Sequence, residues 1–145
     1  MTDRTVLLVE DSPADVLLIQ RAFTRARIAG ALAVVGDGEQ AVAYLSGGGT
    51  FADRDRHPMP DLVLLDLKLP RKSGFEVLEW LRAQPGLRRL PVAVLTSSRE
   101  TSDVDRAYDA GANSYLVKPG NADDLLTLLR DLGLYWQKNE FPSLS

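Results

Sequence analysis

The sequence contains no cysteine, so neither a disulfide nor a thiolate metal site is available to the fold. It also lacks any uninterrupted apolar run of about twenty residues, the length that a membrane-spanning helix needs. The N-terminal segment MTDRTVLLVED has neither the basic start nor the small-residue cleavage site of a signal peptide. We therefore expect a cytoplasmic protein that does not enter a membrane.

Positive charge and histidine are also scarce. Acidic residues outnumber basic ones by 20 to 17, which gives a formal net charge of −3. Nucleic-acid-binding domains usually carry a basic face, so we expect no direct nucleic acid binding. The single histidine, His57, lies in a stretch rich in glycine, proline and charge, and we assign it no role. A histidine phosphotransfer protein presents its histidine on a helix, so that class is excluded.

What the sequence does contain is the composition of one globular domain. Of its 145 residues, 45% are hydrophobic and 26% are charged, values typical of a folded chain with a single core. Five apolar runs are too short for helices and predict buried strands. These runs are Thr5–Val9, Ala31–Val35, Leu62–Asp66, Val92–Leu95 and Ser114–Val117.

Segments with helical spacing separate these runs. Ser12 and Pro13 have the character of an N-cap and a first helical residue, and a helix is predicted from there to about Ile28. The other predicted helices are Glu39–Leu45, one opened by the Ser73–Glu76 capping box, Thr101–Ala110, and one capped by Asn121. Alternating strands and helices predict an α/β fold, in which helices cover both faces of a parallel sheet.

In an open parallel sheet, ligands bind beyond the carboxyl ends of the strands. The residues that follow the predicted strands are therefore the candidate site. They are Glu10 and Asp11 after the first strand, Asp66 at the end of the third, Thr96 and Ser97 after the fourth, and Lys118-Pro119 after the fifth. Three carboxylates, hydroxyl groups and one ammonium group are expected to meet at one edge of the sheet.

Asp66 is the most informative of these residues, because it directly follows the apolar run LVLL. An ionised carboxylate without a partner is expensive to bury in a core, so we expect Asp66 to face a polar pocket. Two carboxylates about 4 Å apart repel by roughly 4 kcal/mol at an effective dielectric near 20, and a hard cation such as Mg²⁺ relieves this repulsion. With Lys118 and Thr96 nearby, such a pocket can hold a phosphate dianion, and a carboxylate nucleophile can form an acyl phosphate.

The stretches LLVEDSPAD, LVLLDLKLPRKSGFEVL, PVAVLTSS and ANSYLVKPG carry these residues. Through them the sequence resembles the receiver domain of two-component response regulators over residues 4–132. The resemblance implies a flavodoxin-like fold with strand order 2-1-3-4-5. It also implies that Asp66 accepts a phosphoryl group from a sensor histidine kinase. Lys118 would contact the phosphoryl oxygens and be followed by a cis peptide bond to Pro119.

The same resemblance implies a magnesium site at the acidic pair Glu10 and Asp11. The ion would be bound by Asp11, Asp66 and the backbone carbonyl of Lys68. Lys68, two residues past the phosphoacceptor, is also expected to influence how long the phosphoryl group persists, because a side chain there can control the access of water.

By the same resemblance, Thr96 is the switch hydroxyl and Tyr115 the switch aromatic. Phosphorylation adds about −1.5 to −2 charges and three strong acceptor oxygens. If Thr96 donates to one of these oxygens, its loop moves inward and space opens for Tyr115. We expect the weakly anchored helix Thr101–Ala110 to shift, which favours a partner-binding surface on the fourth helix, fifth strand and fifth helix.

Few residues follow the last predicted helix, so we expect a stand-alone receiver that regulates through protein contact and is not an enzyme acting on other substrates. We assign residues 133–145 to a C-terminal extension. Its large apolar residues are Leu134, Tyr135, Trp136 and Phe141. This extension either folds back on its own domain or forms a dimerisation arm. Together with the long loop at 47–60, it is similar to the small receivers that accompany bacterial phytochrome kinases.

Three other functions share parts of this pattern. A haloacid-dehalogenase-type phosphohydrolase also uses a strand-end aspartate with Mg²⁺ and lysine, but it needs a second acid where Lys68 stands. A flavodoxin-like cofactor-binding protein needs a phosphate loop rich in serine, threonine and glycine after the first strand, which this sequence lacks. A phosphorelay intermediate that passes its phosphoryl group to a histidine phosphotransfer protein would use the same chemistry at Asp66.

Overall fold

Five parallel strands form the centre of the protein, in a computed structural model that describes residues 4–28 and 30–144. The strands are β1 (Thr5–Val9), β2 (Ala31–Val35), β3 (Leu62–Leu65), β4 (Val92–Thr96) and β5 (Ser114–Val117). Their order in the sheet is β2-β1-β3-β4-β5. This confirms the prediction of a flavodoxin-like sheet with strand order 2-1-3-4-5.

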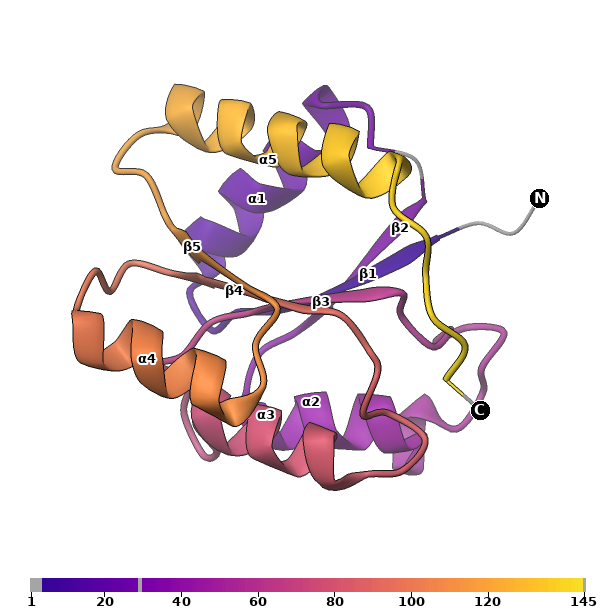
Figure 1. The fold of residues 1–145 in the computed structure, drawn as a ribbon. Coiled ribbons are helices and arrows are strands. Elements are labelled where there is room, and N and C mark those ends of the chain that lie inside the picture. The colour runs from indigo at the N-terminus through magenta and orange to yellow at the C-terminus, as the bar shows by residue number, and fades with distance from the viewer. Residues whose placement is uncertain (1–3, 29, 145) are drawn as a thin grey trace.

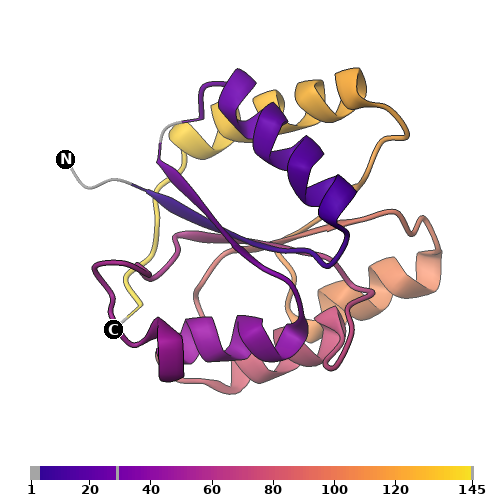
Figure 2. The ribbon, with the colours of Figure 1, turned by 180° about the vertical axis from the view of Figure 1, so that it is seen from behind.

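Five α-helices cover the two faces of the sheet. They are α1 (Pro13–Arg25), α2 (Gly38–Ser46), α3 (Gly74–Ala83), α4 (Thr101–Ala110) and α5 (Ala122–Gln137). Helices α1 and α5 lie on one face, and α2, α3 and α4 lie on the other (Figures 1 and 2). One 3-10 turn, η1 (Gly49–Phe51), interrupts the loop between α2 and β3. None of the helices in the described residues is long and apolar enough to span a membrane.

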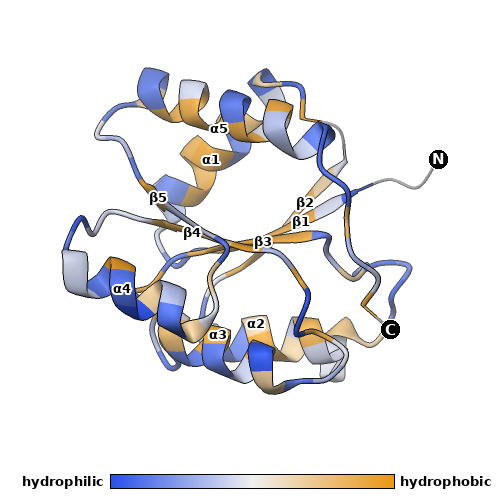
Figure 3. Cartoon of the chain, in the orientation of Figure 1, coloured by the Kyte–Doolittle hydropathy of each residue, from blue (hydrophilic) through white to orange (hydrophobic). Residues whose placement is uncertain are grey.

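Two hydrophobic cores lie on opposite faces of the sheet, because side chains alternate along each strand. In β1, Leu7 and Val9 belong to the core under α2, α3 and α4, whereas Val6 and Leu8 belong to the core under α1 and α5. The middle of the sheet is accordingly hydrophobic, while the helices show hydrophilic segments as well (Figure 3). Helix α4 is the least anchored of the five, since Ala107 is its one buried residue.

Helix α1 ends at Arg25, earlier than the predicted end near Ile28. The reason is the backbone of Arg27, whose φ of 55° lies in the left-handed region and is incompatible with a continuing α-helix. The N–H of Ile28 instead bonds to the carbonyl of Phe23 at 3.4 Å. The chain therefore turns toward β2 several residues sooner than the apolar spacing predicts.

At the other end of the chain, helix α5 continues past Leu132 to Gln137. Trp136, on its last turn, is only 4% exposed. The ring of Phe141 contacts this indole edge-on, with centroids 5.5 Å apart. The guanidinium group of Arg4 lies 4.1 Å from the centre of the Phe141 ring and donates a hydrogen bond of 2.8 Å to the Trp136 carbonyl.

After α5 the chain crosses from one helical layer to the other (Figures 1 and 2). Arg89 donates a hydrogen bond of 3.2 Å to the carbonyl of Ser143, and Leu144 packs against the core on the α2–α3 side. The described part of the predicted extension thus folds back on its own domain; Ser145 lies outside the described residues. Leu134 and Tyr135 nevertheless stay 55% and 69% exposed.

Arg82 forms hydrogen bonds that connect the C-terminal end of α4 to its surroundings. Arg82, on α3, donates through Nε to the carbonyl of Gly111 at 3.0 Å and through a terminal nitrogen to the side chain of Asn113 at 3.0 Å. Its other terminal nitrogen donates to the carbonyls of Arg88 and Leu90, at 2.9 and 2.7 Å. Four hydrogen bonds from one side chain therefore join α3, the α3–β4 loop and the turn after α4.

Candidate functional site

The carboxyl ends of β1 and β3, the first turn of α1 and the residue after β5 bring one lysine together with three carboxylates. The ammonium group of Lys118 donates to Glu10, and it donates to Asp15 and Asp66 at 3.0 Å each. An ammonium group has three N–H donors. Every donor of Lys118 is therefore directed at a carboxylate.

Asp66 is fixed in place by the backbone around it. Its N–H donates to the carbonyl of Val9 at 3.1 Å, which extends the pairing of β3 with β1 by one residue. Gly74, the first residue of α3, packs so closely that a Cβ there would lie 2.2 Å from the Asp66 carbonyl oxygen. Only glycine fits at that position, and sequence reasoning missed it although it directly follows the predicted N-cap Ser73.

Glu10 is the most buried carboxylate of this cluster, with its side chain almost fully buried. One carboxylate oxygen accepts the N–H of Ser12 at 3.1 Å, and the other accepts from Lys118. Burial raises the pKa of Glu10 above its ordinary value, and the bonds from Lys118 and Ser12 offset only part of that rise. Lys118 thus favours the charged form of Glu10 in this environment.

Lys118 is held by its own backbone as well, because its N–H donates to the carbonyl of Thr96 at 2.7 Å. Burial alone would lower the pKa of the Lys118 ammonium group, but the bond to Glu10 and the charge of Asp66 outweigh burial and raise the pKa above its ordinary value. Lys118 is therefore a permanent cation at neutral pH.

The expected cis peptide bond before Pro119 is wrong for this structure, since the described residues contain no cis peptide bond. Even before proline the trans form is favoured by about 0.5–1 kcal/mol. The dipeptide Lys118-Pro119 is the same sequence in either isomer, so the strand-end pattern does not distinguish them.

The acidic residues are suited to a hard cation. Oxygen atoms of Glu10, Asp11 and Asp66 all lie within 4.8 Å of one another, and Asp11 is exposed to solvent. Mg²⁺ prefers oxygen ligands and keeps several waters, so a site with buried and exposed carboxylates matches its chemistry. The backbone carbonyl of Lys68 stays a predicted ligand; the N–H of Lys68 is directed at Asp66 Oδ1 at 3.4 Å, and its side chain is exposed.

The two predicted switch residues lie on neighbouring strands. Thr96 is buried at the end of β4. The hydroxyl group of Tyr115 on β5 donates to the carbonyl of Ser98 at 2.9 Å, and burial raises the pKa of this phenol. The side chain of Ser98 in turn donates to Asp103 on α4 at 2.5 Å. The β4–α4 loop is thereby connected to both β5 and α4.

Asp15 is the member of the cluster that sequence reasoning missed. Its backbone N–H donates to the Ser12 side chain at 3.3 Å and caps α1. The available signal was its place in the first helical turn directly after a strand end, where a side chain can point back over the sheet edge.

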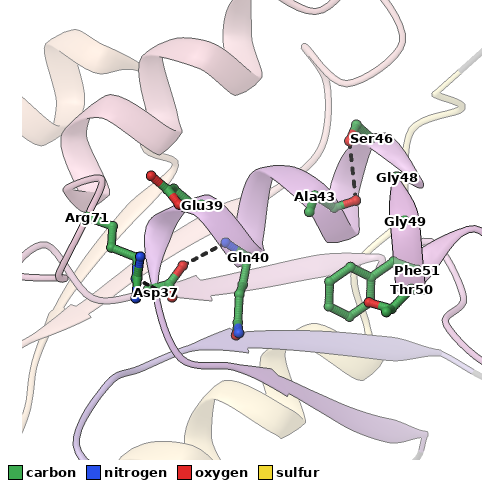
Figure 4. A pocket seen from close by; sticks show the side chains of 10 residues that line it. All are labelled: Asp37, Glu39, Gln40, Ala43, Ser46, Gly48, Gly49, Thr50, Phe51 and Arg71. Carbon is green, nitrogen blue, oxygen red and sulfur yellow. Dashed lines mark hydrogen bonds and ion pairs between the residues drawn. The ribbon is translucent and has the colours of Figure 1, made fainter.

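A separate hollow of about 660 Å³ lies over α2 (Figure 4). Asp37 accepts the N–H of Gln40 at 2.7 Å there and pairs with Arg71 at 3.5 Å. None of the residues that line it belongs to the cluster around Asp66. The strand ends therefore remain the candidate site.

Comparison with known proteins agrees with this location. The response regulator receiver domain family matches residues 6–130 of the chain. The response regulator Rcp1 of Synechocystis sp. is 39% identical over 133 residues, which cover 92% of this chain and 88% of Rcp1. A structure of Rcp1 in a Mn²⁺-bound form has a TM-score of 0.86 and 38% identity, and covers 97% of this chain and 99% of that one.

Two further solved structures are similar over nearly their whole length. The phosphorylated cyanobacterial phytochrome response regulator RcpA has a TM-score of 0.90 and 36% identity, with 98% of this chain and 100% of that chain covered. The response regulator RPA3017, in red light signalling of R. palustris, has a TM-score of 0.91 and 40% identity, with 97% and 99% covered. All three relatives are response regulators.

Proposed function

Because the chain belongs to the response regulator receiver domain family, we propose that Asp66 is its phosphoacceptor and that Glu10, Asp11 and Asp66 surround its Mg²⁺. The chain is a response regulator of a two-component system, and Mg²⁺ is the cofactor of such domains. The observation that carries the assignment is the lysine shared by Glu10 and Asp66, since it places a fixed cation beside a carboxylate at the sheet edge.

In the proposed reaction an oxygen of Asp66 attacks phosphorus of the donor. A bond forms between that oxygen and phosphorus, the bond from phosphorus to the leaving group breaks, and the leaving group keeps the electron pair. Mg²⁺, when bound, neutralises the carboxylates and the phosphoryl oxygens. Lys118, which directly follows β5, stabilises the negative charge of the phosphoryl oxygens, and the Thr96 hydroxyl group donates a hydrogen bond to one of them.

Intact-mass measurement tests this proposal. After incubation with acetyl phosphate and Mg²⁺, the protein is expected to gain one phosphoryl group, and peptide mapping should place it on Asp66. Chelation of the metal should prevent the gain, because the unneutralised carboxylates repel a dianionic donor. A phosphoryl group on another side chain, or no gain with metal present, would contradict the assignment.

We propose that the phosphorylated form presents a changed surface on α4, β5 and α5. Three features support this. Helix α4 buries only Ala107, and its N-cap Glu100 makes no side-chain capping bond. The Tyr115–Ser98 bond connects β5 to the β4–α4 loop, which directly follows Thr96. Amide hydrogen exchange in α4 of the phosphorylated sample is expected to differ from that of the unmodified protein.

Lys68→Ala is expected to shorten the lifetime of the phosphoryl group by about two- to fivefold, the size of effect that one exposed charge supplies. Lys68 stands two residues after Asp66, its backbone N–H is directed at Asp66 Oδ1 at 3.4 Å, and we expect its exposed side chain to limit the approach of water. The measurement is the decay of the phosphorylated mass with time. Lys72→Ala is the matched control, because Lys72 lies on the same loop but pairs with Glu76 at 3.9 Å. Equal decay in both variants would remove the role of Lys68.

We infer that the phosphodonor in the cell is a sensor histidine kinase of the phytochrome type and that this receiver works in the cytoplasm. The support is similarity: RcpA is a phytochrome response regulator and RPA3017 acts in red light signalling. A phosphorelay role, in which Asp66 passes its phosphoryl group to a histidine phosphotransfer protein, is the second candidate because the chemistry is shared. Two measurements separate these candidates: transfer of the phosphoryl group from a purified phytochrome kinase to this protein, and transfer from the phosphorylated protein to a histidine phosphotransfer protein.

We also propose residues 4–132 as the receiver domain and residues 133–145 as an extension that supports a homodimer. Trp136 is already covered within its own domain, whereas Leu134 and Tyr135 are exposed side by side on α5. Exposed aromatic and aliphatic side chains are typical interface anchors, and twofold dimers are the commonest oligomer. Sedimentation of the wild type should give a dimer, and Tyr135→Glu should give a monomer.

A further inference from the structure

Asp15 shares Lys118, the lysine of the proposed phosphorylation site, with Glu10 and Asp66. Phosphorylation converts the single charge of Asp66 into about −1.5 to −2 charges on a group with three acceptor oxygens. Lys118 has no unused N–H to direct at these oxygens, since its donors point to Glu10, Asp15 and Asp66. The N–H of Lys118 that now bonds to Asp66 can bond to the phosphoryl group on Asp66 instead. A second N–H becomes available only if Glu10 or Asp15 releases it.

The three partners differ in how easily they can release Lys118. The side chain of Glu10 is 1% exposed, whereas that of Asp15 is 40% exposed. A released Glu10 would be a buried carboxylate without a cation, which is strongly unfavourable. A released Asp15 would be hydrated, because Asp15 borders a hollow of about 160 Å³ between α1 and the loop that leads to α5. Asp15 is therefore the partner that can leave.

We infer that Asp15 is a positioning residue that holds Lys118 away from the phosphoryl group and so weakens phosphoryl binding at Asp66. The inference rests on the proposed phosphorylation of Asp66. Two physical effects act in the same direction. First, Asp15 occupies one N–H donor of Lys118. Second, the negative charge of Asp15 lies beside the same lysine as the phosphoryl oxygens and repels them.

Substitution of Asp15 tests this inference with beryllofluoride, an inert mimic of the phosphoryl group. In saturating Mg²⁺, Asp15→Asn is expected to bind beryllofluoride about fivefold more tightly than the wild type, because a partly exposed charge pair is removed. Asp15→Glu keeps the charge and should return the affinity to the wild-type value. Titration followed by tryptophan fluorescence or calorimetry gives these affinities, and a separate Mg²⁺ titration establishes saturation for each variant.

A second measurement needs no metal. The ¹⁵N order parameter of the Lys118 ammonium group should fall in Asp15→Asn, since a neutral amide oxygen replaces one of its three carboxylate partners and binds the ammonium group less strongly, and should be kept in Asp15→Glu. Equal or weaker beryllofluoride binding by Asp15→Asn, with binding by the wild type intact, would overturn the inference alone. If the wild type itself binds no beryllofluoride, the proposed function fails and the inference fails with it.

Discussion

No phosphoryl group is expected to appear on the Asp66→Asn variant, even after prolonged incubation with acetyl phosphate and Mg²⁺. An amide has no ionised oxygen to attack phosphorus, so the loss should be complete rather than partial. The substitution also removes one of the three carboxylates of the proposed metal site. Intact-mass measurement is the readout, with the wild type phosphorylated in parallel.

Asp105→Asn is the matched control for this variant. Asp105 is exposed on α4, and its loss removes the same charge from the protein without touching the cluster at the strand ends. This variant should accept the phosphoryl group like the wild type. The variant Asp66→Asn should still fold, because Lys118 keeps Glu10 and Asp15 as partners, and circular dichroism checks this. Phosphorylation of Asp66→Asn at a wild-type level would mean that another residue is the acceptor.

The largest effect on stability is expected for Trp136→Ala, which should lower the free energy of unfolding by about 3–5 kcal/mol. The indole is 4% exposed, belongs to the core under α1 and α5, and lies against Phe141. Its removal leaves a cavity and also exposes the side chain that covers it. The midpoint of urea denaturation, with an unchanged slope, measures the loss.

Its neighbour provides the comparison, since Tyr135 is 69% exposed on the same helical turn. Tyr135→Ala should change the free energy of unfolding of the protomer by no more than about 0.5 kcal/mol, the usual range for exposed positions. The pair thus separates packing within the domain from the proposed dimer contact. A Trp136→Ala variant as stable as the wild type would show that the end of α5 does not contribute to the core.

The strands and the location of the site were predictable because each depends on pattern, whereas the strand order 2-1-3-4-5 was implied by the resemblance to receiver domains. Short apolar runs become strands, and parallel strands bring their carboxyl ends to one edge, so Asp66 and Lys118 could be placed together from sequence alone. The capping residues Ser12, Ser73 and Asn121 were identifiable for the same reason, since their side chains bond to nearby backbone N–H groups.

Contacts between distant segments were not predictable in this way. The tail could equally have folded back or met a second chain, because Phe141 and Trp136 are apolar in either case. Their contacts with Arg4, at the opposite end of the chain, are not visible in the sequence pattern. Asp15 follows the predicted helix start at Ser12 and Pro13, but the direction of its side chain depends on Lys118, more than a hundred residues away. The left-handed φ of Arg27, which ends α1, cannot be predicted from its being an arginine.

The four bonds of Arg82 determine which movements of α4 are compatible with the fold. Two of them fix the turn at Gly111 and Asn113, whereas the side-chain bond between Ser98 and Asp103 joins the opposite end of α4 to the β4–α4 loop. A displacement that preserves the Arg82 bonds is a swing about the C-terminal end, with its largest amplitude near Thr101. We therefore expect any movement of α4 on phosphorylation to pivot at its C-terminal end, where Arg82 of α3 bonds to Gly111 and Asn113.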